Sequence, residues 1–438
     1  MGHGPHLGKA HQALARRLQH GTVAFVEPSD PAAKAAWREI LETLFAPDDA
    51  ALAAKIPVTP SSLERIAGRV GGDKNRVRAR LDAMADKGLV LDLPDGRTGE
   101  TLYMLAPPVV GFFEFSMMRL ADHLPKAKLA KAFDAYWRDP SFSEEVSHGD
   151  TVIGRALAHE SALFDDLLSE VLDWERASAL VGGAAHVSIT NCSCRHKAEH
   201  LGEGCENPLE MCMSLGAAAD YLVRHGLARE ITREEGLDIL VAGREAGLVH
   251  IADNLRSDIS YVCSCCSCCC EELRSVRREL SVVVPSGFQP AVDLQACNGC
   301  ARCLRACPVD AISLVSRRSV SADQADPGAR PVAVVDRDRC IGCGVCVGSC
   351  RHAALRLERR PEQRYVPANS VEFAVRSMME RGRVADLLID GTAGRGPAFA
   401  NAVIRTIVSL PPAERLIASE QVRSRFVRFA LSRVGPPT

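Results

Sequence analysis

The chain reads CNGCARCLRACP at residues 297–308 and CIGCGVCVGSC at residues 340–350. Both stretches have the spacing C-x2-C-x2-C-x3-C, and the second begins 43 residues after the first. Three thiolates in so tight a loop can bind three corners of one cubane 4Fe-4S cluster, whereas the fourth cysteine is carried away by the following helix. The spacing therefore predicts two 4Fe-4S clusters, each of which takes its fourth ligand from the other stretch.

Under this exchange, each cluster has three ligands from one loop and one from the other. Cluster 1 is expected on Cys297, Cys300, Cys303 and Cys350, and cluster 2 on Cys340, Cys343, Cys346 and Cys307. The competing interpretation is a pair of structural zinc sites. It is disfavoured because a zinc site takes its four ligands without this tandem exchange.

The two loops belong to a longer internal repeat, since residues 292–315 and 335–358 align without a gap. Each half predicts a short strand, the cysteine loop, a short helix and a returning strand. Glycines beside the ligands let backbone N–H groups approach the cluster. In these features residues 290–360 resemble the bacterial two-cluster ferredoxins, which implies a (βαβ)2 module and electron transfer. Residues 321–331 are expected to form an inserted loop between the halves.

Ten further cysteines lie outside this repeat and form two groups. The first group, in TNCSCRHKAEHLGEGCENPLEMC (190–212), consists of Cys192, Cys194, Cys205 and Cys212. The alternating run 186–190 predicts a strand that ends just before the first two cysteines. Residues 207–210, Asn-Pro-Leu-Glu, predict a helix start, which places Cys212 about one turn inside a helix. This group is expected to bind an iron-sulfur cluster, with structural zinc as the alternative.

Two further residues of this segment, Arg195 and His196, directly follow the first pair of cysteines. They are expected either to neutralise or hydrogen-bond the metal centre or to have a plain surface role.

The second group lies in YVCSCCSCCC (261–270) and is denser. It consists of Cys263, Cys265, Cys266, Cys268, Cys269 and Cys270. Neighbouring side chains point to opposite sides of an extended chain, so we expect these thiols to serve more than one metal centre, or one centre with spare thiols for exchange or substrate chemistry. The thiols of both groups together can hold two further 4Fe-4S clusters with two thiols left over, or one larger cluster.

These motifs also resemble, over residues 180–362, a family of multi-cluster 4Fe-4S ferredoxin-type proteins. The matching motifs are C-x-C-R at 192–195, Gly-Cys followed by Pro-Leu-Glu-x-Cys at 204–212, and C-x-CC-x-CCC at 263–270. The resemblance implies iron-sulfur electron transfer and one or two clusters beside the two of the repeat. It does not specify a reaction, so the sequence leaves open whether the protein is an enzyme.

The composition is that of an ordinary globular protein, with 438 residues, 47% of them hydrophobic and 25% charged. A formal charge of −2 provides no basic field for nucleic acid, and no apolar run is long enough to suggest a membrane span. The N-terminus lacks the features of an export signal, so a cytoplasmic location is expected. In a reducing compartment, 18 cysteines are more typical of metal ligands than of disulfides.

The N-terminal third predicts a different kind of module. Residues 61–107 contain a helix, a Gly-Gly turn, a second helix that begins at Asp73, and two strands around a Pro-Asp-Gly turn. This order is typical of a winged helix. In the second helix the core-facing residues are Val77, Leu81 and Met84, and the cations available for phosphates are Lys74, Arg76, Arg78 and Arg80.

We therefore expect an α+β, multidomain chain. Its expected parts are an N-terminal tail (1–33), a winged-helix-like module (34–107), a helical connector (108–180), a mainly helical cysteine-rich domain (181–284), a two-cluster ferredoxin domain (285–362) and a helical C-terminal tail (363–438).

Three functions are compatible with this organisation. The first is an electron-transfer protein that serves a redox partner or belongs to an oxidoreductase as one of its subunits. The second is an oxidoreductase whose active site is the cysteine-rich centre of residues 192–270. The third is an iron-sulfur redox sensor that binds DNA through the winged-helix-like module. Nucleic acid is the less expected partner, because a sensor needs only one cluster.

Overall fold

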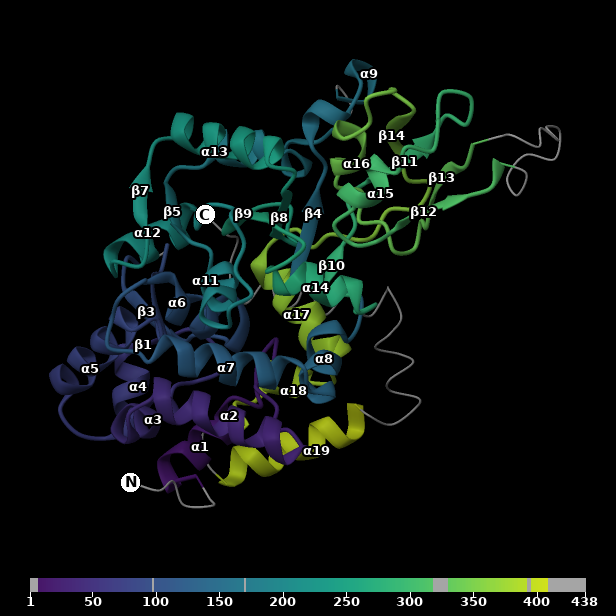
Figure 1. Ribbon diagram of the computed structural model, residues 1–438. Coiled ribbons are helices and arrows are strands. Elements are labelled where there is room, and N and C mark those ends of the chain that lie inside the picture. The colour runs from purple at the N-terminus through teal and green to yellow at the C-terminus, as the bar shows by residue number, and fades with distance from the viewer. Residues whose placement is uncertain (1–6, 97, 169–170, 318–329, 392–394, 409–438) are drawn as a thin grey trace.

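The computed structural model describes residues 7–96, 98–168, 171–317, 330–391 and 395–408, and within them the fold is α+β (Figure 1). N-terminal helices occupy one end of the molecule in Figure 1, a seven-stranded sheet lies in the middle, and the two cysteine loops of the repeat lie at the opposite end. None of the helices in the described ranges combines the length and the apolar character needed to cross a bilayer.

The N-terminal end is a helical layer with an aromatic core. Its helices are α1 (Lys9–Arg17), α2 (Pro31–Leu44), α3 (Pro47–Ala53), α6 (Phe113–Met118), α7 (Lys126–Trp137) and α8 (Pro140–Ser147). Helix α2 begins at Asp30, whose carboxylate accepts the backbone N–H of Ala33. The ring of Phe25 packs 4.6 Å from that of Tyr136, between the first two helices and α7.

Residues 61–105 contain the succession of helices and strands that the sequence predicts. The elements are β1 (Ser61–Ser62), α4 (Leu63–Val70), α5 (Lys74–Asp86), β2 (Val90–Pro94) and β3 (Thr101–Leu105), with the sheet order β1-β3-β2. Asp73 caps α5, and the three residues predicted to face the core, Val77, Leu81 and Met84, are buried. Of the four predicted phosphate-binding cations, Arg80 instead pairs with Asp48 and Asp49, and Lys74 pairs with Glu64.

The middle of the chain is built on a sheet, in contrast to the mainly helical domain that the sequence predicts. We call this sheet the central sheet; its strands, in spatial order, are β10 (Val283–Val284), β4 (Gly154–Leu157), β8 (Val249–Asp253), β9 (Tyr261–Cys265), β6 (Glu210–Leu215), β5 (Val187–Asn191) and β7 (Arg229–Ile231). Only β10 and β4 pair in parallel among these described strands.

Short helices connect these strands. They are η2 (Glu160–Ala162), α9 (Asp165–Leu168), η3 (Asp173–Glu175), α10 (Ala177–Gly183), α11 (Ser193–His200), α12 (Gly216–Arg224), α13 (Arg233–Glu245) and α14 (Glu271–Arg277). The irregular turn η1 (Pro108–Phe112) lies earlier, between β3 and α6. Thr232 caps α13 by accepting the backbone N–H of Glu235 at 3.1 Å.

The helix predicted to begin at residues 207–210 is wrong, because the chain there enters strand β6. Cys212 lies opposite Thr190 on one side and opposite Cys263 on the other. Asn207 and Pro208 give a local signal for a helix start, but the residues after them pair with two strands at once. The backbone hydrogen bonds and burial of a central strand therefore override the local preference.

Residues 288–359 form a separate unit, which we call the two-loop module. It contains β11 (Phe288–Val292), α15 (Arg302–Ala306), β12 (Ile312–Val315), β13 (Val332–Val335), α16 (Val345–Gly348) and β14 (Leu355–Arg359). Strand β11 pairs antiparallel with β14, and β12 pairs antiparallel with β13, so the two halves of the repeat are joined on both sides. The predicted insertion at 321–331 falls largely outside the described residues.

After the two-loop module the described chain contains three helices and reaches residue 408. Residues 409–438 of the predicted helical tail lie outside the described residues. Helices α17 (Ser370–Glu380), α18 (Val384–Leu388) and α19 (Arg395–Val408) return to the N-terminal helical layer (Figure 1). Arg383 reaches the buried carboxylate of Glu145 with two hydrogen bonds of 2.6 Å, and Asp386 lies 3.0 Å from the ring of His20. The two ends of the described chain thus pack against each other.

Candidate metal centres

The first cysteine loop of the two-loop module encloses a small cavity. Its lining includes Cys297, Cys300, Cys303 and Cys350, which are the four residues predicted for cluster 1. Cys300 is exposed, and Asn298 beside it hydrogen-bonds the ring of His352 at 2.9 Å. The cavity therefore lies close to the surface.

The second cysteine loop lies deeper. Cys340, Cys343 and Cys346 are buried, and burial raises the pKa of the Cys343 thiol to about 12. Negative charge on Cys340 and Cys307 raises the same pKa further, so the structure brings the predicted fourth residue of cluster 2 to this loop. The backbone N–H of Ala311 donates to the sulfur of Cys307 at 3.2 Å.

Glycine is required at equivalent positions of the two loops. Gly299 and Gly342 have φ angles of +69° and +71°, which side chains rarely adopt. A Cβ atom on Gly299 would lie 2.2 Å from the carbonyl oxygen of Pro331, and one on Gly342 would lie 2.1 Å from that of Phe288. Because glycine has no Cβ atom, each loop can turn tightly enough to gather its cysteines.

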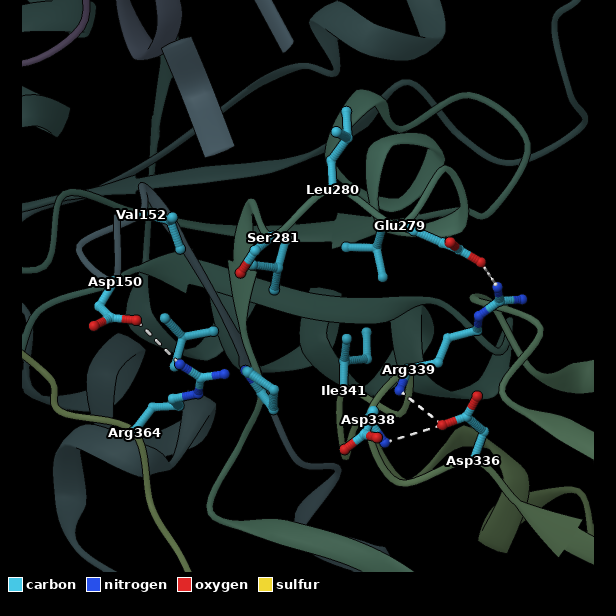
Figure 2. Close-up of a pocket in the computed structure, with 14 residues that line it drawn as sticks. Asp150, Val152, Glu279, Leu280, Ser281, Asp336, Asp338, Arg339, Ile341 and Arg364 are labelled. Atoms are coloured by element: carbon cyan, nitrogen blue, oxygen red, sulfur yellow. Dashed lines mark hydrogen bonds and ion pairs between the residues drawn. The ribbon is translucent and has the colours of Figure 1, made fainter. Parts of the chain in front are cut away.

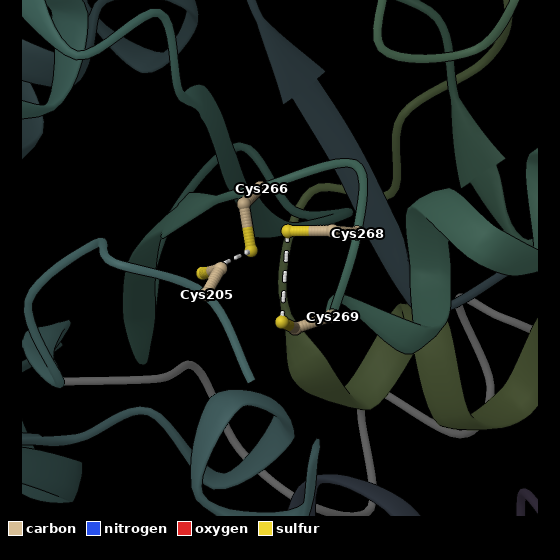
Figure 3. A group of neighbouring side chains, drawn as sticks. All are labelled: Cys205, Cys266, Cys268 and Cys269. Carbon is tan, nitrogen blue, oxygen red and sulfur yellow. Dashed lines mark hydrogen bonds between the residues drawn. The ribbon is translucent and has the colours of Figure 1, made fainter. Parts of the chain in front are cut away.

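The other ten cysteines separate into two sets that differ from the groups in the sequence. The four-thiol site consists of Cys205, Cys266, Cys268 and Cys269 (Figure 3). Its four sulfur atoms lie within 4.8 Å of one another. Two of the distances are 3.9 Å, between Cys205 and Cys266, and 3.6 Å, between Cys268 and Cys269. Such a compact set of thiols can bind one metal ion.

The remaining six thiols form what we call the six-thiol ring. In order around the ring they are Cys192, Cys194, Cys270, Cys265, Cys263 and Cys212, each within hydrogen-bonding reach of the next, and the last of the first. Strands β6 and β9 contribute the cross-strand pair of Cys212 and Cys263, whereas Cys192 and Cys270 precede α11 and α14. The ring is thus assembled from four separate elements.

The direction of the pKa shift alternates from one thiol to the next around this ring. Hydrogen bonds from neighbouring thiols lower the pKa of Cys192 and Cys270, and they lower that of Cys263 to about 6. The same hydrogen bonds raise the pKa of the donors Cys194, Cys212 and Cys265. A lowered pKa favours the thiolate, which is the form that binds metals.

Arg195 lies between the six-thiol ring and the four-thiol site. Its guanidinium donates to the carbonyl oxygens of Pro208 at 2.8 Å and Ser264 at 2.7 Å. Burial lowers the pKa of Arg195, but negative charge on Cys192 and Cys266 outweighs burial and raises it above its usual value. Of the two predicted roles, Arg195 therefore has the one that neutralises the thiols. The ring of its neighbour His196 instead contacts the carbonyl oxygen of Met117.

A cavity of about 520 Å³ borders the six-thiol ring and is lined mainly by apolar side chains. Five carboxyl groups also line it, and burial raises the pKa of three of them, that of Glu114 to about 7 and those of Glu272 and Asp253 in the same direction. The buried hydroxyl of Tyr261 has no hydrogen-bond partner among the described residues. Val110, also at the cavity, has a φ of 50°, which is strained for a β-branched residue.

A chain of contacts links the second cysteine loop to the six-thiol ring. The backbone N–H of His159 donates to the carbonyl oxygen of Cys343 at 2.9 Å. The rings of His159 and His250 lie 5.1 Å apart, and His250 Nδ1 lies 3.3 Å from the hydroxyl of Ser264. Ser264 separates two ring cysteines on β9. The same apolar cluster also buries Cys265, Cys270, Cys340 and Cys343.

A second pocket, of about 320 Å³, lies where the loop before Cys340 meets the central sheet (Figure 2). Its charged side chains are paired with one another: Asp150 with Arg364 at 3.2 Å, and Glu279 with Arg339. The carboxylate of Asp336 accepts the backbone N–H groups of residues 338 and 339. These pairs hold the module against the sheet, and we assign no chemistry to this pocket.

No sequence motif marks the residues that surround the thiols. Glu114, Val110 and Tyr261 come from separate parts of the chain and carry no motif. Their shared place is visible only in the folded protein.

Comparisons with known proteins agree with the two-loop module. Residues 296–354 match the family described as 4Fe-4S dicluster domain. The chain is similar to an iron-sulfur subunit of the CoB--CoM heterodisulfide reductase of Methanocaldococcus jannaschii, with 31% identity over 92 residues. This similarity covers 19% of the chain and only 13% of the relative's length. No solved structure matches the chain. The protein therefore carries a 4Fe-4S dicluster domain at residues 296–354.

Proposed function

We propose that the protein transfers electrons through iron-sulfur clusters, as a redox partner or as one subunit of an oxidoreductase. Bound 4Fe-4S clusters supply one-electron oxidation and reduction. The observation that carries the proposal is the cavity of the first loop, which combines three cysteines of that loop with Cys350 of the other. The similarity to an iron-sulfur subunit of heterodisulfide reductase supports the role within a larger oxidoreductase.

We assign the ligands of the two clusters by this exchange. Cluster 1 takes Cys297, Cys300, Cys303 and Cys350, and cluster 2 takes Cys340, Cys343, Cys346 and Cys307. The residues fit such clusters, because backbone N–H groups already donate to ligand sulfurs. Ala333 donates to Cys297 at 3.5 Å and Gly342 to Cys340 at 3.4 Å. Hydrogen bonds of this kind help to set a cluster's potential.

The two loops differ in burial, so the module has an exposed end and a buried end. The exposed loop around Cys300 is the side on which we place the external redox partner. The buried loop around Cys343 faces the six-thiol ring through His159 and His250. We propose that this contact route connects the module with the six-thiol ring and the four-thiol site, which we together call the thiol-rich centre. This centre binds one or two further metal centres.

An oxidoreductase with its active site at the thiol-rich centre is the second candidate. The specific observation in its favour is the cavity of about 520 Å³ beside the six-thiol ring. Backbone strain such as that of Val110 is concentrated at functional sites in proteins. The substrate of such an enzyme stays open.

The DNA-binding alternative has less support. We keep the name winged helix as a proposal for residues 61–105, whose strand β2 packs on the rest of the chain. The hydroxyl of Tyr221 in α12 donates to the carbonyl oxygen of Val90 at 2.9 Å, and Arg224 pairs with Asp92. The module therefore has a structural role in this chain that requires no nucleic acid.

The experiment that tests the proposal compares the protein with Cys343→Ser and Cys300→Ser variants, all purified without oxygen. Electron paramagnetic resonance of the reduced wild type is expected to show two interacting 4Fe-4S clusters. Each variant should lose or convert one cluster, with a loss of about one to four irons. An unchanged spectrum and iron content in both variants would refute the ligand assignment.

A further inference from the structure

The six-thiol ring offers more sulfur ligands than one cubane cluster can use. We propose that it holds a single iron-sulfur cluster with more than four irons, bound through all six cysteines. The assignment of iron rests on the proposed function, because the contact route through His159 and His250 would serve no purpose for redox-inactive zinc.

The contacts among the six thiols argue against a cubane with two spare thiols. Each sulfur has two other ring sulfurs as neighbours, and the sequence of contacts closes on itself. A cubane has four iron corners and binds four thiolates. The closed order of contacts leaves no four of the six sulfurs as a separate set, so one centre with at least six ligand positions fits it best.

Six metal-bound thiolates also carry more negative charge than one metal ion balances. Six thiolates would place six negative charges in a buried region, and the carboxyl groups of Glu114 and Glu272 line the same cavity. Arg195 supplies one positive charge against this set. Burying uncompensated charge is costly, so binding through all six thiolates needs more than one metal ion. One tetrahedral ion would bind four thiolates and leave two unpaired.

The scaffold of the ring is suited to a large rigid cofactor. Two ring cysteines form a direct cross-strand pair in the middle of the central sheet, and two others precede helices. Sites on strands and helix starts hold their side chains more accurately than sites on loops. The adjoining cavity of about 520 Å³ provides room that a single metal ion would not need.

The four-thiol site differs in geometry, and this supports a second assignment. A tetrahedron of thiolates around zinc has sulfur-sulfur distances of about 3.8 Å, given zinc-sulfur bonds of about 2.3 Å. The two short distances, 3.9 Å and 3.6 Å, match this value. We infer that Cys205, Cys266, Cys268 and Cys269 bind one zinc ion.

The test is the content of iron, acid-labile sulfide and zinc in the full chain purified without oxygen. The wild type should contain about one zinc and more than about twelve irons, since the two-loop module accounts for about eight. Cys263→Ser should lose more than four of those irons and keep the zinc. Cys266→Ser, three residues further along the chain, is the matched control. This variant should lose the zinc and keep the iron.

Two results would overturn the cluster assignment: a loss of four irons or fewer in Cys263→Ser, or a loss of zinc in that variant. A loss of iron in Cys266→Ser would overturn the zinc assignment. If a variant fails to fold, Mössbauer spectra of the wild type give the answer directly. More than about a third of the iron should then lie outside the two ferredoxin-type cubanes.

These outcomes are separate from those of the proposed function. The ring's iron is obtained from the difference between wild type and Cys263→Ser, which leaves the two-loop module unchanged. Failure of Cys343→Ser to alter a ferredoxin-type cluster would count against the electron-transfer proposal alone. Failure of Cys263→Ser to lose iron would count against the ring alone.

Discussion

The backbone N–H of His159 donates to the carbonyl oxygen of Cys343 at 2.9 Å. This hydrogen bond joins the segment after β4 of the central sheet to the more buried loop of the two-loop module. Gly344 lies against the same segment, since a Cβ atom there would be 3.5 Å from that of His159. The two thiol-bearing parts of the protein are therefore in direct contact, and changes in one are expected to reach the other.

Gly342→Ala should disrupt the second cysteine loop. The added methyl group would lie 2.1 Å from the carbonyl oxygen of Phe288, at a φ of +71°. A strained residue of this kind costs about 1–3 kcal/mol, and the clash adds to it. We expect the variant to lose about four irons and to unfold at lower temperature. Gly348→Ala is the control because a Cβ atom there has no neighbour within 4 Å, and equal losses in both variants would contradict the argument.

Stability should depend on pH through His225, which contacts Asp92 at 2.9 Å and Asp86 at 2.7 Å. Burial lowers the pKa of His225, but hydrogen bonds to these carboxylates outweigh it and raise the pKa. For Asp92 the signs are reversed. Burial raises the pKa of this carboxyl, but hydrogen bonds from His225 and Arg224 outweigh burial and lower the pKa to about 2.

The histidine contribution is complete below its ordinary pKa of about 6.5 and is lost as pH rises through the raised value. The Asp92 contribution is complete above about 4 and is lost as pH falls toward its lowered value. Thermal unfolding should therefore separate wild type from His225→Gln most between about pH 4 and 6.5, and little in alkaline solution. His186→Gln, at a half-exposed histidine, should show no such window. A difference that grows with pH would be the wrong sign.

Removing the carboxylate of Glu145 should loosen the contact between the C-terminal helices and the N-terminal layer. Its oxygens accept two hydrogen bonds from Arg383 at 2.6 Å and one from the backbone of Ala24 at 2.8 Å. Breaking a buried pair from one side costs about 3–5 kcal/mol. We expect Glu145→Ala to lose this much in denaturant unfolding. The neighbouring Glu144→Ala should stay within about 0.5 kcal/mol of wild type, because Glu144 is exposed, and a similar loss there would contradict the assignment.

Arg195→Met should weaken both sites of the thiol-rich centre. The change leaves the buried carbonyl oxygen of Ser264 without its donor, at about 1–3 kcal/mol. It also removes the donor to the carbonyl oxygen of the exposed Pro208 and a positive charge beside the thiols. We expect metal to be released from both sites at lower chelator concentration. Arg233→Met, on the exposed side of α13, is the control. Metal retention equal to wild type in Arg195→Met would show that Arg195 is only a packing residue.

The sequence predicts the two-loop module well because its information is local. Each loop carries its cysteines, glycines and short helix within about 20 residues, so spacing alone determines what lies together. The winged-helix-like elements are readable for the same reason, with Asp73 as a helix cap. The arrangement of the other ten thiols cannot be read in this way.

Cys205 shows why. In the sequence it belongs with Cys192, Cys194 and Cys212, but in the fold it joins three cysteines from the turn after β9. The partition depends on the register of β6 against β9 and on where α11 begins, and both are set by long-range pairing. The local helix signal at Asn207 and Pro208 points the other way. Tertiary pairing decides such cases, and spacing does not report it.

The packing of the two chain ends has a kinetic consequence. His20 and Asp386 are separated by 366 positions in the chain, yet they lie 3.0 Å apart. Contacts between such distant residues slow folding, because a long loop must close before they form. During synthesis all the cysteines emerge from the ribosome before the helices that seal the N-terminal layer. The nascent chain thus has an interval in which its thiols are present and its fold is still open, and this is the period in which metals can be delivered.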